Sequence, residues 1–407
     1  MIVQKGMKQK KLMLLGGIRY LLPVIKAAHE RGYYVITADY LPNNIAHKYS
    51  DEYVNVSIID KEAVLRVAQE KQIDGIMSFG VDPGVVSAAY VAEKMGLPFQ
   101  CSYESACILQ DKSRFRQFLA EHGFNCPKAK GYDNIEEAIN DTNYFTWPVI
   151  VKPVDSAGSK GVTKVSHKED LEQAIEKALS SSIGKHFIIE EFLVAEGQSS
   201  GSESFFVDGE LRYNAFYDQL FELNSLNPYV PMVEQWPSVK DELLLTDVKQ
   251  QLQRLSDLLG FRSGIFNVEW RASGGKVYLM EVSPRAGGNR LAEILNYATD
   301  IDIIEAEMLK SVSVDCGVVQ EPKYKGNYAI YNLHSNRHGH FKKLSIDPSF
   351  EKKYLIEKEI RVEVGDTVEP FAGANTSFGT LFLRTDTRQE MDAILKSIDK
   401  YINIVLE

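Results

Sequence analysis

Two glutamates in the stretch 266–290, FNVEWRASGGKVYLMEVSPRAGGNR, are spaced so that they could bind a cation together. Glu269 lies in one strand-like run and Glu281 in the next, with a turn at residues 273–276 between them. Because alternate side chains of a strand share a face, the glutamates face each other if the loop has an odd length, whereas a two-residue loop separates them. Facing carboxylates repel each other, and a divalent cation such as Mg²⁺ removes that repulsion. The pattern predicts a metal site, and an exposed hairpin with ordinary surface charges is the alternative.

Upstream segments carry groups suited to phosphates and to a nucleotide base. The loop 155–162, DSAGSKGV, has small residues that let backbone N–H groups approach phosphate oxygens, and Lys160 adds positive charge. Lys152 stands inside an apolar strand, where a lysine needs a partner such as a phosphate. Glu190 stands in another apolar strand, where it can accept a hydrogen bond from an adenine amino group. The alternative for the loop is a flexible glycine hairpin.

Composition limits the class of protein and its partners. The chain has 407 residues, which predicts two or three domains. A net charge of −10 argues against a nucleic-acid or anionic-membrane surface. The four cysteines form no CxxC pair, so we expect a reduced interior and a cytoplasmic location. The apolar run at 12–15 is too short for a signal sequence, and no segment is long enough for a membrane helix.

The elements that must position these residues begin with a parallel sheet. We expect strands at residues 12–15, 35–39, 53–58 and 75–79, alternating with helices at residues 20–31, 61–71 and 83–95. This alternation predicts a Rossmann-like α/β domain. The GxGxxG signature is absent, since positions 18 and 21 are Ile18 and Leu21, so we do not expect NAD to bind.

Further along, a helix is expected from Asp111 to His122, with Asp111 as its N-cap. The segment after about residue 311 is strand-rich, and we expect its final helix at residues 389–404. The predicted domains are a Rossmann-like unit at 1–110, a two-lobed α+β unit at 111–310 with a small lobe at about 125–195, and a small α+β unit at 311–407.

The order and spacing of the motifs resemble those of the ATP-grasp superfamily of carboxylate–amine ligases. The matching series is Asp111-Lys112, Val151-Lys152-Pro153, SAGSKGV, IIEEFL, NVEW and MEVSPRAGG, and it spans residues 12 to 309. The resemblance is closest to the branch with carbamoyl-phosphate synthase large-subunit halves, phosphoribosylamine–glycine ligase and L-amino acid ligases. It implies a pre-ATP-grasp domain followed by an ATP-grasp domain.

The resemblance also implies a role for each motif residue. Lys112 and Lys152 would contact the phosphates of ATP, and the loop would close over them. That loop consists of Ser156, Ala157, Gly158, Ser159, Lys160, Gly161 and Val162. The adenine would be read by Glu190 and by the backbone of Glu191 and Leu193. Glu269 and Glu281 would bind Mg²⁺ or Mn²⁺, Arg285 would steady the transferred phosphoryl group, and Asn289 and Arg290 would meet the substrate.

The chain departs from the superfamily pattern at two points. Ser283 stands where many relatives have an asparagine metal ligand; its hydroxyl, or a water, would take that place. The usual ribose carboxylate is not in its usual sequence context, and Glu196 or Glu203 would serve instead. A histidine cluster at His334, His338 and His340 lacks a fourth ligand for zinc and is interpreted as a hairpin with surface histidines.

The function expected from these observations is an ATP-dependent ligase. A carboxylate would attack ATP to give an acyl phosphate and ADP, and an amine or ammonia would then displace phosphate. A kinase that phosphorylates a small molecule and a non-catalytic nucleotide-binding regulator are the alternatives. The expected partners are a small-molecule carboxylate and an amine, with no nucleic acid and no membrane, and a homodimer is possible.

Overall fold

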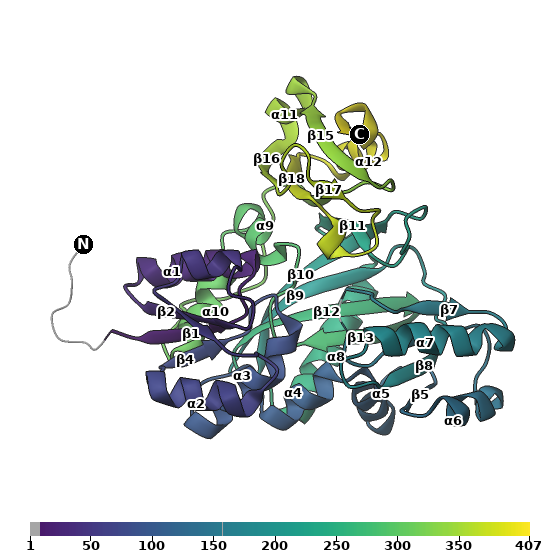
Figure 1. Ribbon diagram of the computed structural model, residues 1–407, viewed down its shortest axis with the longest axis horizontal. Helices are drawn as coiled ribbons and strands as arrows, with labels where there is room; N and C mark the ends of the chain where they lie inside the picture. Colours follow the sequence, from purple (N-terminus) through teal and green to yellow (C-terminus); the bar gives the residue numbers. More distant parts are fainter. Residues whose placement is uncertain (1–8, 157) are drawn as a thin grey trace.

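The computed structural model describes residues 9–156 and 158–407, and its N-terminal part is the parallel sheet that the alternating pattern predicts (Figure 1). The strand order is β3-β2-β1-β4, and each pair of neighbours is parallel. Residues 12–15 of β1 are fully buried, which explains why this strand is a continuous apolar run in the sequence. The elements are β1 (Lys11–Leu15), α1 (Leu22–Glu30), β2 (Tyr34–Asp39), β3 (Glu52–Asn55), α2 (Lys61–Lys71), β4 (Gly75–Met77), α3 (Asp82–Met95) and α4 (Tyr103–Gln110).

The next part is a small lobe with an antiparallel sheet of order β5-β8-β6-β7, at the right of Figure 1. It follows helix α5, which begins after Asp111 as expected: Oδ1 of Asp111 accepts hydrogen bonds from the backbone N–H groups of Ser113 and Arg114 at 2.8 and 3.0 Å. Helix α7 packs its buried face against this sheet. The elements are α5 (Lys112–Glu121), β5 (Ala129–Tyr132), α6 (Ile135–Asn140), β6 (Val149–Pro153), β7 (Thr163–Val165), α7 (Leu171–Ser181) and β8 (Phe187–Glu191).

An eight-stranded sheet of order β13-β12-β9-β10-β11-β14-β18-β16 connects the middle and the end of the chain. Phe205, Phe206 and Trp270 are at most 1% exposed and pack in its core. Because β11 pairs with β14, the sheet combines strands from both sides of residue 311, and the domain division at 310 stays a prediction. The elements are β9 (Ser200–Val207), β10 (Glu210–Phe221), β11 (Pro231–Trp236), α8 (Glu242–Leu259), β12 (Gly264–Ser273), β13 (Lys276–Ser283), α9 (Leu291–Ala298), α10 (Ile303–Ser311), β14 (Asn327–Leu333), β16 (Leu355–Ile360) and β18 (Gly379–Thr385).

The C-terminal segment adds a three-stranded sheet of order β17-β15-β19, seen with its helices at the top of Figure 1. The long final helix expected at residues 389–404 is wrong in its second half. Helix α12 ends at Lys396, and residues 402–406 form β19, where Ile402, Ile404 and Val405 pair with β15. Their β-branched side chains favour the strand. The elements are β15 (Gly339–Ile346), α11 (Pro348–Tyr354), β17 (Thr367–Val368), α12 (Arg388–Lys396) and β19 (Ile402–Leu406).

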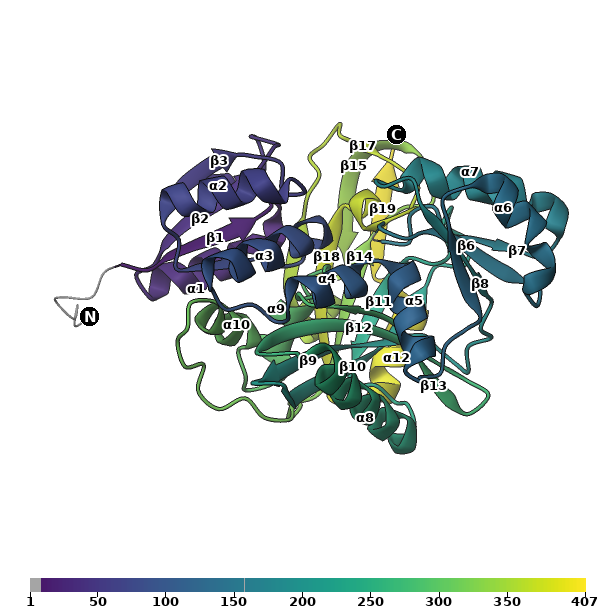
Figure 2. The ribbon, with the colours of Figure 1, turned by 90° about the horizontal axis from the view of Figure 1, so that it is seen from below.

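Figure 2, seen from below, places the N-terminal sheet and the small lobe at opposite ends of the molecule, with the large sheet between them. Within the described ranges, no helix has the length and apolar character needed to cross a membrane.

Candidate functional site

A cavity of about 700 Å³ lies where these parts of the chain meet. Its wall includes Asp82 from the N-terminal part, Lys152 from the small lobe, Glu281 from the large sheet and Arg361 from the C-terminal segment. The sequence-predicted site residues that line it are Lys112, Lys152, Ser156, Gly158, Ser159, Lys160, Val162, Glu190, Glu269, Glu281, Arg285 and Asn289. The first and last of these predicted residues, Lys112 and Asn289, are 177 positions apart in the sequence, and the fold brings them to one cavity.

Strands β12 and β13 place Glu269 opposite Glu281, although the turn between them has only two residues, Gly274 and Gly275. Ser273 pairs with Lys276 at the turn, and the register then shifts between Trp270 and Glu269 because β13 carries one additional residue, Met280. A bulge of this kind moves the following side chains to the other face. Of the two alternatives, the facing arrangement is found, but a bulge within the strand produces it instead of an odd-length loop.

The two facing carboxylates have opposite pKa shifts. Although Glu269 is exposed to the cavity, partial removal from bulk water and the negative charge of Glu281 raise its pKa. Burial would also raise the pKa of Glu281, but the charges of Lys112 and Arg285 outweigh it and lower that pKa. Nζ of Lys112 lies 3.2 Å from Oε2 of Glu281, whereas no described residue forms an ion pair with Glu269. The negative charge of Glu281 is therefore balanced by Lys112, whereas that of Glu269 is not balanced by an ion pair among the described residues. This arrangement suits an additional cation between the two carboxylates.

Lys152 and Glu190 form a buried ion pair with a second cation, Arg116. Nζ of Lys152 lies 2.5 Å from Oε1 of Glu190, and Nε of Arg116 lies 3.0 Å from Oε2. Burial lowers the pKa of Lys152 to about 8, against the attraction of Glu190. Burial would raise the pKa of Glu190, but the two cations lower it to about 2. Lys152 and Glu190 line the cavity with Arg116 buried behind them, and the net positive charge of the trio favours an anionic ligand.

The partner of the buried lysine is thus Glu190 in this structure, where the sequence suggested a phosphate. Both oxygens of Glu190 are engaged, and its contact with adenine stays a prediction.

The glycine loop begins at a firmly held residue and lies against a second loop. Asp155 accepts hydrogen bonds from the hydroxyl of Ser182 and from two backbone N–H groups of residues 183 and 184. Further on, the hydroxyl of Ser159 donates to the backbone carbonyl of Tyr229, and Nδ2 of Asn227 donates to the carbonyl of Ser159. Ala157 lies outside the described residues. The loop therefore connects the small lobe to residues 222–230, and Ser159 and Tyr229 both line the cavity.

Arg285 is held by Asp82, at the start of helix α3 in the N-terminal part. Nε and Nη2 of Arg285 donate to the two carboxylate oxygens of Asp82 at 2.8 and 2.7 Å, a bidentate arrangement. Nη1 donates to the backbone carbonyl of Ala286. The side chains of Arg285 and Asp82 are 7% and 20% exposed. This pair connects the N-terminal part to the loop after β13 and fixes the guanidinium beside Glu281.

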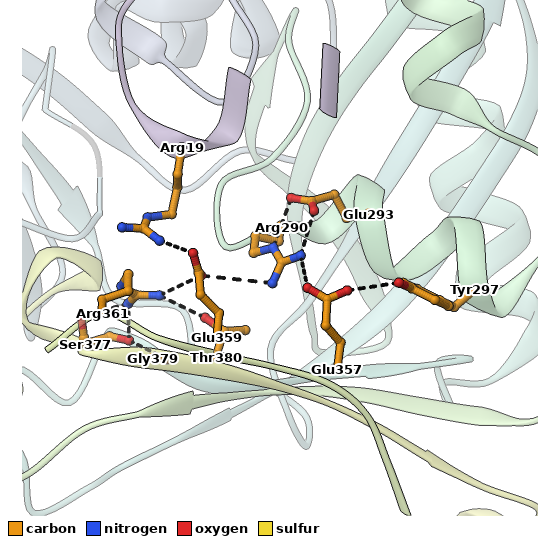
Figure 3. A network of polar contacts seen from close by, with 10 residues as sticks. All are labelled: Arg19, Arg290, Glu293, Tyr297, Glu357, Glu359, Arg361, Ser377, Gly379 and Thr380. Atoms are coloured by element: carbon orange, nitrogen blue, oxygen red, sulfur yellow. Dashed lines mark hydrogen bonds and ion pairs between the residues drawn. The ribbon is translucent and has the colours of Figure 1, made fainter. Parts of the chain in front are cut away.

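Asn289 lines the cavity, whereas its neighbour Arg290 points into a separate network (Figure 3). Arg290 pairs with Glu293 at 2.7 Å and with Glu357 at 2.5 Å. Nearby, Glu359 lies between Arg290, Arg19 and Arg361, so the network connects three parts of the chain. The predicted contact of Arg290 with substrate is not seen in this geometry and stays a prediction.

Several other predicted residues are not brought to the cavity wall among the described residues. The Ser283 hydroxyl donates to Asp82 and accepts from Gln110, so it is already engaged. Glu196 accepts a hydrogen bond from the N–H of Gly275 at the hairpin turn. Glu203 is buried and accepts from Asn267 and from the N–H of Gly287. Glu191, Leu193 and Gly161 also lie outside the lining.

Sequence reasoning missed several residues of the site, among them Tyr20, Asp82 and Glu234 in the cavity wall and Arg116 behind it. Arg116 is 2% exposed on the face of α5 that also buries Phe115, and Glu234 is 2% exposed in β11. A charged residue inside an apolar pattern was the available signal in both cases. Tyr20 and Asp82 carry no such signal, because their roles depend on how the N-terminal part packs against the rest.

The histidine segment does not gather a metal site in the structure. His334 is buried with Nδ1 beside the carbonyl oxygen of Asn332, and His338 lies beside Glu369. Within the described residues, no group of three or more His, Cys, Asp or Glu side chains is placed to hold a metal.

Comparison with known proteins finds a matching domain and distant relatives. Residues 145–293 match the family model of the ATP-grasp domain. The formate-dependent phosphoribosylglycinamide formyltransferase of Synechococcus sp. strain RCC307 is 27% identical over 277 residues, covering 67% of this chain and 69% of that protein. The carbamoyl phosphate synthase large chain of Clostridium beijerinckii is 22% identical over 311 residues, covering 74% of this chain but only 28% of that protein.

The fold agrees with the family match. The crystal structure of an L-amino acid ligase from Bacillus licheniformis superimposes with a TM-score of 0.81 at 19% identity, covering 99% of this chain and 100% of that one. Residues 145–293 therefore match an ATP-grasp domain, and the fold of the whole chain is similar to that of the L-amino acid ligase. The resemblance and the fold class predicted from the motif order are thereby confirmed.

Proposed function

We propose that the protein is an ATP-dependent ligase that joins a carboxylate to an amine or ammonia and releases ADP and phosphate. The observation that carries this proposal is the convergence of two lysines, a facing carboxylate pair and Arg285 on one cavity. Lys112 contacts Glu281 at 3.2 Å, and its Nζ also donates to the backbone carbonyl of Ser156 at 3.1 Å. Lys112 therefore connects the glycine loop to the facing carboxylate pair.

The residues fit Mg²⁺ or Mn²⁺, since Glu269 and Glu281 face each other and one of them lacks a cation among the described residues. A bound divalent ion would neutralise phosphate charge there, with phosphate or water oxygens as its remaining ligands. Lys112 and Lys152 would hold the phosphates of ATP. The loop from Ser156 to Val162 would cover them and exclude water.

In the reaction, an oxygen of the substrate carboxylate attacks the γ-phosphorus of ATP, the bond to the bridging oxygen breaks, and ADP leaves. The amine nitrogen then attacks the acyl carbon, phosphate leaves with the electrons of the C–O bond, and the amine loses a proton. Arg285 would hold the phosphoryl oxygens during transfer, and Asn289 would contact the substrate. The protein contributes positioning and charge stabilisation in both steps.

The test is a screen of carboxylic acids, each with and without an amine, for release of ADP and phosphate. A ligase releases phosphate only when an amine accompanies the acid, whereas a kinase forms ADP and a phosphorylated product with no free phosphate. A regulator binds ATP without forming ADP under any substrate set, and that outcome would refute the proposal. Glu172→Gln, an exposed carboxylate on α7, serves as a matched control for glutamate variants of the cavity. The homodimer and the cytoplasmic location stay predictions.

A further inference from the structure

Glu234 is a buried carboxyl group in the wall of the cavity, and no charged partner accounts for it. It lies in β11, is 2% exposed and lines the cavity. Oε1 accepts a hydrogen bond from Nδ2 of Asn289 at 3.1 Å, whereas Oε2 has no hydrogen-bond partner among the described residues. Burial raises the pKa of Glu234 to about 8. Burying a carboxyl without a full set of partners costs free energy, so this placement calls for a ligand.

The other acidic side chains of the cavity wall differ from Glu234 in this respect. Asp82 pairs with Arg285, Glu190 with Lys152, and Glu281 with Lys112. Glu269 belongs to the facing pair that suits a metal ion. Arg361, which lines the same cavity, already donates to Ser377, Thr380 and Glu359. Among the described residues, Glu234 is the carboxyl of this wall that the phosphate and metal machinery leaves unexplained.

The geometry around Glu234 is held in place from outside the cavity. Asn289 and Arg290 are consecutive non-glycine residues with φ of 54° and 65°, a conformation that costs free energy for such residues. Arg290 is fixed by Glu293 and Glu357 (Figure 3), which keeps the preceding amide against Glu234. Arg290 is therefore a positioning residue, because it holds Asn289 in place against the carboxyl group of Glu234.

Glu234 lines the same cavity as the carboxylate pair, Glu269 and Glu281. Tyr217 lines the same cavity, and burial, followed by the negative charges of Glu203, Glu269 and Glu234, raises the pKa of its hydroxyl. Asn267, two residues before Glu269 on β12, has its Nδ2 3.4 Å from the same hydroxyl. Glu234 and the carboxylate pair line one cavity of about 700 Å³, which is large enough for a small molecule.

We propose that the substrate carboxylate is that of an amino acid, with its ammonium group bound to Glu234. This inference rests on the ligase function proposed above and names the substrate class. The ammonium group would donate to Oε2 of Glu234, supply the missing cation, and leave Asn289 on Oε1. The carboxylate of the same molecule would then point toward Glu269, Glu281 and the phosphates. A site built around a charged hydrogen-bonding partner rejects analogues that lack it, because the buried carboxyl is then left unpaired.

The experiment measures which acids the protein activates. Hydroxylamine replaces the natural amine, so that hydroxamate formation with Mg·ATP reports the activated carboxylate directly. Each of the common amino acids is compared with its hydroxy-acid and des-amino counterparts, which keep the carboxylate and the side chain. We expect at least one amino acid to exceed its counterparts by about a hundredfold in kcat/KM. Glu234→Gln, which keeps the shape and removes the charge, should reduce that preference to less than about tenfold.

Glu307→Gln is the matched control. Glu307 is equally buried, its pKa is also raised to about 8 by burial, and its Oε2 also lacks a partner among the described residues. Glu307 does not line the cavity, and its Oε1 accepts a hydrogen bond from Nε2 of Gln100. This variant should therefore keep the full amino-acid preference. Loss of the preference in Glu307→Gln as well would show a general effect of removing a buried carboxyl and would overturn the assignment.

The outcomes separate this inference from the proposed function. Equal activation of plain or hydroxy acids by the wild-type protein overturns the amino-acid subsite and leaves the ligase in place. If no acid yields ADP or hydroxamate, the ligase proposal fails, and the subsite is decided by calorimetry with amino acids in the presence of Mg²⁺ and a non-hydrolysable ATP analogue. Binding that Glu234→Gln removes supports the subsite, and no binding overturns it. The wild-type series decides the question even if Glu234→Gln fails to fold.

Discussion

Two substitutions at one ion pair separate a catalytic role of Arg285 from a structural one. Arg285→Lys keeps a positive charge but loses the fork that donates to both oxygens of Asp82 at 2.8 and 2.7 Å. Asp82→Asn keeps the guanidinium and removes its anionic partner. If Arg285 holds phosphoryl oxygens in the transition state, Arg285→Lys should lower kcat by about a hundredfold or more, equivalent to about 2.7 kcal/mol. Asp82→Asn should then keep kcat within about tenfold, because the arginine remains.

The stability expected for each variant follows from burial. Removing one partner of a buried pair costs about 3–5 kcal/mol. Because the Asp82 side chain is 20% exposed and Arg285 retains its bond to the carbonyl of Ala286, we expect about 3 kcal/mol for Asp82→Asn. Arg285→Lys retains one charged contact and should lose less, about 1–2 kcal/mol. Urea unfolding measures both losses.

The assay for function is ADP release per folded molecule, with nucleotide affinity measured separately. Arg384→Lys is the control, since Arg384 is an exposed arginine 3.7 Å from its partner Asp386. It should change neither stability nor kcat. If Asp82→Asn and Arg285→Lys lose kcat equally, and in proportion to their loss of stability, Arg285 only steadies the loop and the reasoning is refuted.

Three further predictions concern metal, loop and pH. Glu281→Gln should abolish ADP formation because it removes half of the charge that a divalent ion needs, while metal-free ATP binding changes less; near-normal turnover would contradict the metal assignment. Amides of residues 155–162 should gain protection from hydrogen exchange when Mg·ATP is added, and unchanged protection would make the segment a structural turn. The pKa of Glu307 is raised to about 8, so the stability that its protonated form provides is complete below about pH 4.5 and is lost as the pH rises through about 8. Urea unfolding between about pH 7 and about pH 9 should show a loss of about 1.4 kcal/mol from this group that Glu307→Gln lacks, and an equal slope in both proteins would contradict the shift.

Local patterns made much of the fold predictable. Alternating apolar runs and helices predicted the parallel sheet, and the position of Asp111 predicted the cap of α5, because both depend on neighbours in the sequence. The final helix was wrong beyond Lys396 because pairing with β15 decided the structure of residues 402–406. A tertiary contact of this kind overrides a local helical pattern.

The site was predictable where a charged residue interrupts an apolar strand, as at Lys152 and Glu190. The sequence did not decide whether Glu269 and Glu281 face each other, because the bulge at Met280 has no signature in the sequence. The partner of Arg285 could not be found either, because Asp82 is 203 residues away and reaches it only through the packing of α3.

The continuous pairing from β10 through β11 to β14 limits how the chain can be divided. A truncated chain that stops near residue 310 would leave one side of β11 as an unprotected edge, with the unpaired backbone groups of residues 233–236 open to other chains. Such an edge favours self-association, so the shortened protein should aggregate instead of folding into a smaller soluble unit. Because Glu234 lies on that strand, the wall of the cavity depends on residues that follow the last predicted nucleotide-binding motif in the sequence.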